Sequence, residues 1–343
     1  MSRRLPRPRG GRAFAVLVLV TVAFAGGHLT ATRPVVEYGQ KAVNAADHPR
    51  KDVPAAAAGA PAGGGGADAA FCRPRADTKV FDFESHDPML ATARGVHYLV
   101  AGTAGDQRLY RSTDPTDPDS WTLVDGDYLT DRFEFDSLIE VDGRYVAYGN
   151  SNVYTAASVA TDGWTQRNSF TGFSDLGAYY DEDTGLVHVY YEYGEAAGLS
   201  GKKIGHAVSP NGVSNWTVYP PVWTAPDGYG VGDFDVVERN GTIYVFGDYD
   251  EHHPRYNVSV WVNDDPYSGF TQLDDHALTH RLGDTQYGDD YGVADPSVAR
   301  LDDGRFLMLA NGYANESAAA TLHYYVGDVG ENATVPRACG GAA

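Results

Sequence analysis

Lysine is scarce in this sequence. Only five of the 343 residues are lysine, and arginine brings the basic total to 26 against 46 acidic residues, for a formal net charge of −20 at pH 7. Such a surface repels nucleic acids and anionic lipids, so we expect neither as a partner. Asp-rich turns in an all-β protein would explain the acidity, and so would adaptation to high salt.

Cysteine is equally rare, since Cys72 and Cys339 are the only two in the chain. They flank the part of the chain that we expect to fold. A disulfide between them would join its two ends and would agree with an oxidising compartment. Two unpaired thiols are the alternative.

Several common signatures are missing. The sequence has no long helical pattern, no zinc-like histidine spacing, no nucleophile elbow, and no phosphate-loop or dinucleotide fingerprint. These absences argue against nucleotide-dependent enzymes, zinc hydrolases and α/β-hydrolases. We therefore expect no required cofactor.

The first 70 residues differ from the rest. Residues 1–12 contain five arginines, and residues 13–25 are apolar and end in Ala23-Phe24-Ala25. This pattern predicts a signal peptide over residues 1–25, with an uncleaved membrane anchor as the alternative. Residues 26–70 predict an Ala/Gly-rich flexible linker. We expect a secreted or extracellular monomer, tethered to the cell surface if the N-terminal segment is retained and otherwise not bound to a membrane.

Residues 71–340 contain five copies of one unit, which predicts a single domain. In each copy an Asp opens a short apolar run, a Gly-containing turn follows, and a second strand comes next. The five aspartates are Asp87, Asp136, Asp175, Asp235 and Asp295, and the turn glycines lie at 95, 143, 185, 241 and 304. Repeats of this length made of short strands predict an all-β fold, a five-bladed β-propeller. We expect the blades near residues 85–128, 133–170, 173–224, 231–275 and 291–335.

A second signal recurs towards the end of four blades, where an aromatic residue precedes threonine. The four pairs are Trp121-Thr122, Trp164-Thr165, Trp216-Thr217 and Phe270-Thr271. We expect these rings to pack between neighbouring blades. The fifth blade lacks the signal, and the segment Lys79-Val80-Phe81-Asp82-Phe83 would supply its outer strand and close the ring.

The innermost strands of a propeller converge on its axis, so the aspartates that open them would crowd one end of the channel. Crowded carboxylates raise one another's pKa, so one can act as an acid while a neighbour stays a base. Two carboxyls about 6.5–9.5 Å apart leave room for a water, as in inverting glycoside hydrolysis. Alternatively, the aspartates cap turns, or several of them hold a calcium or sodium ion on the axis.

Two stretches resemble the five-bladed glycoside hydrolases of family 43 and its relatives. They are His86-Asp87-Pro88-Met89-Leu90 and the run from Ala294-Asp295-Pro296 to Gly304-Arg305-Phe306. The resemblance implies that Asp87 is the general base, which activates water, and that Asp175 orients the acid and tunes its pKa.

The fourth blade departs from the family pattern. The family's general acid there is a glutamate, whereas this chain has Gly232-Asp233-Phe234-Asp235. Asp233 and Asp235 are therefore both candidates for the acid. Some relatives use histidine, so His252, His253 and His280 are further candidates, as is Glu192.

The resemblance implies that an oligo- or polysaccharide, of arabino- or xylo-type, is hydrolysed with inversion. We expect His86, Asp136, Asp295 and Tyr291 to contact the sugar, with Asp136 and Asp295 mainly architectural. The missing glutamate favours a second hypothesis, a non-catalytic carbohydrate-binding or adhesion propeller. A structural cell-surface protein that uses its linker as a stalk is a third.

Overall fold

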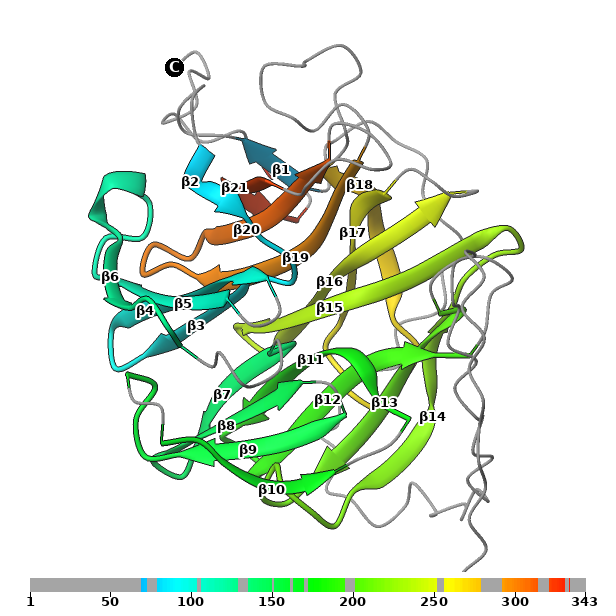
Figure 1. Cartoon of the computed structure of the whole chain (residues 1–343). Coiled ribbons are helices and arrows are strands. Elements are labelled where there is room, and N and C mark those ends of the chain that lie inside the picture. Colours follow the sequence, from blue (N-terminus) through cyan, green and yellow to red (C-terminus); the bar gives the residue numbers. More distant parts are fainter. Residues whose placement is uncertain are drawn as a thin grey trace, which may run out of the picture. The chain divides into compact units, whose positions relative to one another are not determined.

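Five antiparallel β-sheets fan out around one axis in the computed structural model (Figure 1). The all-β, five-bladed propeller predicted from the repeat is confirmed. The structure describes residues 69–72, 79–103, 106–128, 135–149, 151–160, 163–169, 172–194, 201–251, 256–278, 292–313, 321–330 and 333. Within these residues the only helical element is the 3-10 turn η2 (Pro118–Ser120), and no helix is long and apolar enough to cross a membrane.

Each of the first four blades has four strands in chain order from the axis outwards. Blade 1 consists of β3 (Met89–Ala93), β4 (Val96–Thr103), β5 (Asp106–Ser112) and β6 (Thr122–Asp125). Blade 2 consists of β7 (Ser137–Val141), β8 (Arg144–Gly149), β9 (Asn152–Ala156) and β10 (Thr165–Ser169).

The third and fourth blades also have four strands each. Blade 3 consists of β11 (Ser174–Asp181), β12 (Leu186–Tyr193), β13 (Lys203–Ser209) and β14 (Thr217–Thr224). Blade 4 consists of β15 (Tyr229–Arg239), β16 (Thr242–Glu251), β17 (Tyr256–Asn263) and β18 (Thr271–Leu278). The glycines of the five inner hairpins all have φ between +69° and +87°, a region that glycine enters without steric cost; they are Gly95, Gly143, Gly185, Gly241 and Gly304.

The fifth blade joins the two ends of the described chain. It consists of β19 (Gly292–Arg300), β20 (Phe306–Tyr313) and β21 (Thr321–Val329), and both β1 (Ala69–Cys72) and β2 (Lys79–Glu84) pair antiparallel with β21. The expectation that residues 79–83 complete this blade is confirmed, and β1 adds a second N-terminal segment to the same strand. Cys339 lies outside the described residues, so its pairing with Cys72 stays a prediction.

Five apolar clusters hold the ring together, one between each pair of neighbouring blades. Successive side chains of an inner strand enter different clusters, because their direction alternates along a strand. Met89 packs against blade 2, whereas Leu90 packs against blade 5. The four aromatic residues predicted to lie between blades do so, and they are Trp121, Trp164, Trp216 and Phe270.

Near the axis, hydrogen bonds at one repeated position link neighbouring blades. Ser137 Oγ accepts from the amide of Ala178 at 3.1 Å, and Ser297 Oγ accepts from the amide of Leu90 at 2.7 Å. At the same place in blade 4, Asp235 accepts from the amide of Val298 at 2.6 Å. These bonds join the inner strand of blade 2 to that of blade 3, blade 5 to blade 1, and blade 4 to blade 5.

Blade 3 has Gly177 at this position, and its inner strand lies against the backbone of blade 4. A Cβ atom on Gly177 would lie 2.7 Å from Asp235 Cα. Such a separation is shorter than any normal packing contact, so the inner strands of blades 3 and 4 can approach this closely only at a glycine.

We expect Gly177→Ala to lower the free energy of unfolding by about 1–3 kcal/mol, because the methyl group would push these strands apart. Chemical denaturation measures the change. Gly126→Ala is the matched control, since its new Cβ would have its nearest neighbour, Leu123 Cδ2, at 3.7 Å. Equal losses in the two variants would contradict this account of the seam.

Candidate functional site

Four aspartates, one just before an inner strand and three within inner strands, share one unusual backbone conformation. Their φ angles are positive, at 43° for Asp87, 49° for Asp175, 47° for Asp233 and 54° for Asp295. Residues other than glycine seldom adopt this left-handed region, and such strain concentrates at functional sites. In blades 3, 4 and 5 the register shifts at this aspartate, between Ser174 and Gly177, Gly232 and Asp235, and Ala294 and Ser297. A bulge of this kind redirects a side chain that would otherwise follow the strand.

This geometry corrects the repeat in two blades. The fourth copy begins at Asp233, not at Asp235, since Asp233 carries the bulge and the positive φ. In blade 2 the equivalent position is Phe135, which lies eight residues before its turn glycine, as Asp87 and Asp233 do. Phe135 is buried in the cluster between blades 1 and 2. Asp136 is therefore one position away from the other blade-opening aspartates.

Asp87, Asp233 and Asp295 meet at one point, where one carboxylate oxygen from each lies within 4.8 Å of the other two. Three ionised carboxylates cannot share so small a space without a proton or a cation to reduce their repulsion. The spacing is also narrower than the about 6.5–9.5 Å between the two carboxyls of an inverting glycosidase.

Asp233 has the most perturbed environment of the three. Burial raises its pKa well above the usual range, and Asp175, Asp248, Asp295 and Asp87 raise it further. Within the described part of the chain, no hydrogen-bond donor contacts its carboxyl. Both conditions favour the protonated form of Asp233.

Asp295 differs because donors stabilise its negative charge. Its Oδ2 accepts from Asn311 Nδ2 at 2.6 Å and from Tyr313 Oη at 2.9 Å, and its amide donates to Asp248 Oδ1 at 2.9 Å. Burial raises the pKa of Asp295, whereas these two side-chain donors and His86 lower it. Asp295 is thus better suited than Asp233 to remain ionised.

Asp248, Asn311 and Tyr313 were missed by the sequence reasoning, which followed only the innermost strands. They lie on the second strands, where Asp248 faces Gly232, Asn311 faces Ala294 and Tyr313 faces Gly292. Asp248 and Asn311 each lie seven residues after the hairpin glycine of their blade. Counting residues along both strands from that glycine would have placed each of them opposite the residue that precedes the bulge.

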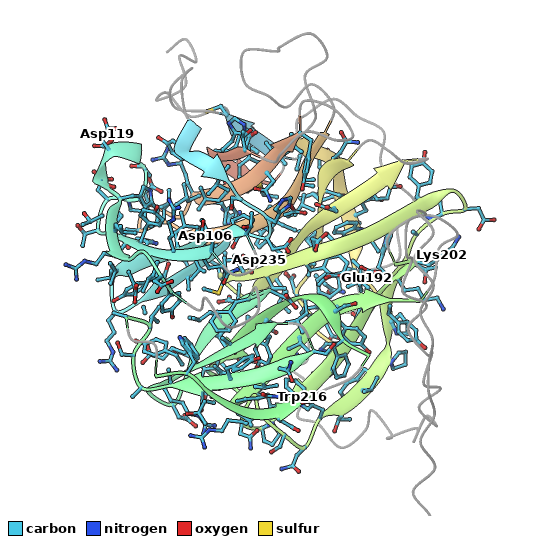
Figure 2. The ribbon with its side chains drawn as sticks, viewed as in Figure 1. Asp106, Asp119, Glu192, Lys202, Trp216 and Asp235 are labelled. Carbon is cyan, nitrogen blue, oxygen red and sulfur yellow. The ribbon has the colours of Figure 1, made fainter. Side chains whose placement is uncertain are left out.

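Asp235 serves the seam between blades. Its side chain accepts from Val236 N at 2.7 Å, Val298 N at 2.6 Å and Ser297 Oγ at 3.0 Å. Burial raises the pKa of Asp235 to about 7, against the lowering effect of these three donors. Figure 2 shows Asp235 near the middle of the view, whereas Asp119, Lys202 and Trp216 lie towards its outside.

Of the other residues that the sequence suggested for the site, the structure describes some and not others. Asp175 contributes to the electrostatic environment of both Asp233 and Asp295. Glu192 pairs with Ser174, the residue before Asp175, and packs against Gly201. Four other predicted residues lie outside the described residues, and they are His252, His253, His280 and Tyr291.

The same three carboxylates also suit a cation by their chemistry. Calcium takes carboxylate oxygens as ligands, and Asp87, Asp233 and Asp295 each offer one within 4.8 Å of the others. A cation there would neutralise the charge that a proton on Asp233 otherwise reduces.

A large cavity lies at the opposite end of the inner strands. It has a volume of about 1920 Å³ and is lined on the axis by the residues that follow the seam position, namely Leu90, Leu138, Ala178, Val236 and Val298. Its outer wall carries Tyr180, Tyr267 and several carboxylates from the hairpins. The lining of this cavity includes none of Asp87, Asp175, Asp233 or Asp295.

Comparison with solved structures identifies the architecture. A thermostable family-43 glycoside hydrolase matches 74% of this chain and 93% of its own, at a TM-score of 0.53 and 14% identity. The chain has the fold of the five-bladed glycoside hydrolases. No protein-family model and no curated protein sequence matches it.

Two further enzyme structures show the same fold. The catalytic domain of a GH62 α-L-arabinofuranosidase from Coprinopsis cinerea matches 74% of this chain and 92% of its own, with a TM-score of 0.52 and 12% identity. A xylan β-1,4-xylosidase from Bacillus halodurans C-125 has a TM-score of 0.55 and 12% identity, over 73% of this chain and 54% of its own. At such identities the similarity shows the fold alone.

The two neighbouring carboxyls of blade 4 should respond oppositely to replacement by asparagine. At pH 8, we expect Asp235→Asn to lower the free energy of unfolding by about 1–3 kcal/mol. Both carboxylate oxygens of Asp235 accept hydrogen bonds, so the NH₂ group of asparagine would replace an acceptor and face another donor. Asp233→Asn should be neutral or stabilising, since asparagine tolerates a positive φ and a source of repulsion is lost. Thermal and chemical denaturation test both, and a larger loss in Asp233→Asn would overturn the assignment.

Proposed function

We propose that the protein is a glycoside hydrolase that uses Asp87 as the general base and Asp233 as the general acid. One observation carries the proposal: three aspartates with positive φ angles, from separate blades, bring their carboxyls to one point. Strain of this kind is retained where it positions a functional group. The fold, shared with solved glycosidases, supports a glycan as the substrate.

The proposed proton balance follows from the neighbours of each carboxyl. Asp233 has a raised pKa, so it holds a proton that it can donate to the leaving-group oxygen. Hydrogen bonds from Asn311 and Tyr313 offset part of the rise that burial causes in the pKa of Asp295, so we assign the negative charge to Asp295 and the proton to Asp233. Asp87 activates the water, and Asp175 adds to the negative field around the acid.

Within this proposal we infer inversion on an arabino- or xylo-configured glycan, from the resemblance to family 43. Water and sugar have to enter between carboxyls that now lie within 4.8 Å, so substrate binding must separate Asp87 from Asp233. The side chain of Asp233 is one methylene shorter than that of a glutamate. The sugar must therefore lie closer to the backbone of blade 4 than it would if a glutamate were the acid.

We propose that the enzyme acts outside the cell as a monomer, either secreted or tethered by a retained N-terminal segment. The arginine-rich start and the apolar run over residues 13–25 support export. A Cys72–Cys339 disulfide would be consistent with an oxidising compartment.

Asp87→Asn should lower turnover of an arabino- or xylo-oligosaccharide by about 10²–10⁴-fold, because the amide cannot accept the proton of the attacking water. Release of reducing sugar measures the rate, and NMR of the first product anomer tests inversion. Asp136→Asn is the matched control, since Asp136 is one position away from the blade-opening aspartates, and it should retain activity. Unchanged turnover in Asp87→Asn would overturn the proposal.

The second candidate is a glycan-binding propeller without catalysis. The close approach of Asp87, Asp233 and Asp295 and the missing glutamate favour it. Saturable binding of such an oligosaccharide by the wild-type protein, with no product released, would support this candidate and exclude the hydrolase.

We propose that no metal is required and that the proton on Asp233, rather than a calcium or sodium ion, relieves the repulsion between the three carboxylates. Treatment with a chelator should therefore leave turnover unchanged, as measured on the same oligosaccharide. A loss of activity that calcium restores would show that a cation on the axis has this role.

A further inference from the structure

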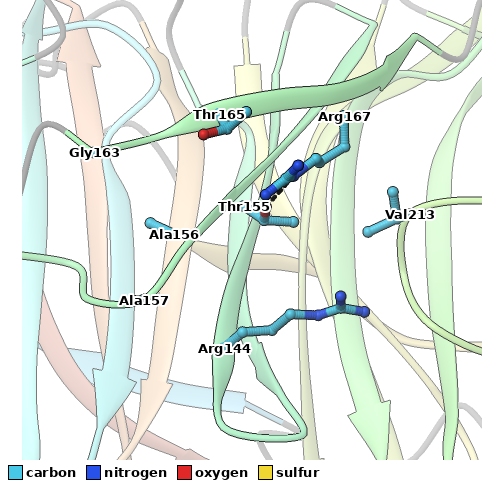
Figure 3. Close-up of a pocket in the computed structure, with 8 residues that line it drawn as sticks. All are labelled: Arg144, Thr155, Ala156, Ala157, Gly163, Thr165, Arg167 and Val213. Carbon is cyan, nitrogen blue, oxygen red and sulfur yellow. Dashed lines mark hydrogen bonds between the residues drawn. The ribbon is translucent and has the colours of Figure 1, made fainter.

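A groove between blades 2 and 3 is lined by two arginines and by no acidic residue within the described part of the chain (Figure 3). It has a volume of about 550 Å³, within the range of about 300–1,000 Å³ typical of small-ligand pockets. Two arginines face it, Arg144 from β8 and Arg167 from β10. Acidic residues outnumber basic ones by 46 to 26 in the whole sequence, yet both charged residues that line this groove are arginines.

Neither guanidinium is neutralised by a carboxylate within the described residues. Four other arginines do form ion pairs, and they are Arg94, Arg108, Arg239 and Arg305. Arg144 instead donates to the backbone oxygen of Asn211 at 3.0 Å, and Arg167 donates through Nε to Thr155 Oγ1 at 2.8 Å. Each guanidinium has five N–H donors, so most of its donors remain available.

These two contacts fix the arginines before any ligand binds. Asn211 belongs to a tight turn in which its side chain accepts from the amides of Val213 and Ser214, both at 2.9 Å. Thr155 is buried, with 7% of its surface exposed. A guanidinium that is already positioned loses less conformational entropy on binding than a free one.

The rest of the groove is small and uncharged. Its other lining residues are Thr155, Ala156, Ala157, Gly163, Thr165 and Val213. Such a surface accepts a compact body with hydroxyl and C–H groups, and the two guanidinium groups select an oxyanion on it.

We propose that this groove binds a sugar-sized ligand that carries a carboxylate or sulfate group. Arg144 and Arg167 would contact the oxyanion, while the threonine and alanine side chains contact the neutral part. Arg144 follows an inner hairpin glycine, so the groove lies at the hairpin end, away from Asp87 and Asp233. The proposal does not depend on the hydrolase activity.

Binding should be measured by calorimetry at low ionic strength with glucuronic acid, glucose 6-sulfate and uncharged glucose. We expect saturable binding of at least one anionic probe and binding of glucose at least tenfold weaker. Binding of glucuronic acid alone would identify a carboxylate site, binding of glucose 6-sulfate alone a sulfate site, and binding of both a general oxyanion site.

Variants locate the binding. Arg167→Gln and Arg144→Gln should each weaken it at least tenfold, and Arg167→Lys should weaken it because lysine lacks the planar fork of donors. The matched control is Arg111→Gln, which removes an exposed arginine of blade 1 outside the groove. Asp233→Asn, at the other end of the propeller, should also leave binding unchanged.

Three outcomes would overturn the proposal: no saturable binding of either anionic probe, equal binding of glucose, or an equal loss of binding in Arg111→Gln. Thermal melting of each variant confirms that it is folded, and the substituted arginines are at exposed positions. Failure here would leave the hydrolase proposal intact, since turnover is measured on neutral oligosaccharides.

Discussion

The close approach of five inner strands around one axis is the constraint on which this structure depends. Backbone amides donate to the side chains of Ser137, Asp235 and Ser297 and so join the strands at equivalent positions. Gly177 lets blades 3 and 4 meet where a methyl group would not fit. Ser297 also donates to Asp235, so one polar chain links blades 4, 5 and 1. The apolar clusters between blades complete this seam further from the axis.

The carboxylate site is a product of the same convergence. A regular inner strand would point its side chains into the clusters on either side, as Met89 and Leu90 do. The bulges in blades 3, 4 and 5 interrupt that alternation and redirect one aspartate in each blade. The strain of four positive φ angles and the repulsion between carboxylates are thus confined to one place, where a proton or a ligand can relieve them.

Much of the fold could be read from the repeat, because hairpin glycines, alternating strands and interblade aromatic residues are local signals. The same reasoning singled out Asp87, Asp175 and Asp295, which the structure shows to share a positive φ angle. It failed in blade 4, where Asp235 fits the apolar pattern better than Asp233, because a bulge at Asp233 inserts one residue into the strand and shifts its register. It also gave Asp136 a place that Phe135 occupies, and it missed Asn311 and Tyr313, whose contacts with Asp295 cross between strands.

The sequence by itself determined the number of blades, the acidic surface and the set of aspartates that could reach the axis, since these follow from composition and periodicity. Only the tertiary structure decided which carboxyls meet, which one has no donor among the described residues and which one joins two blades. Those distinctions depend on a backbone turned by a single residue and on donors supplied by neighbouring strands. The presence of Arg144 and Arg167 in one groove likewise arises from the folding of blade 2, whose sheet places β8 and β10 on either side of β9.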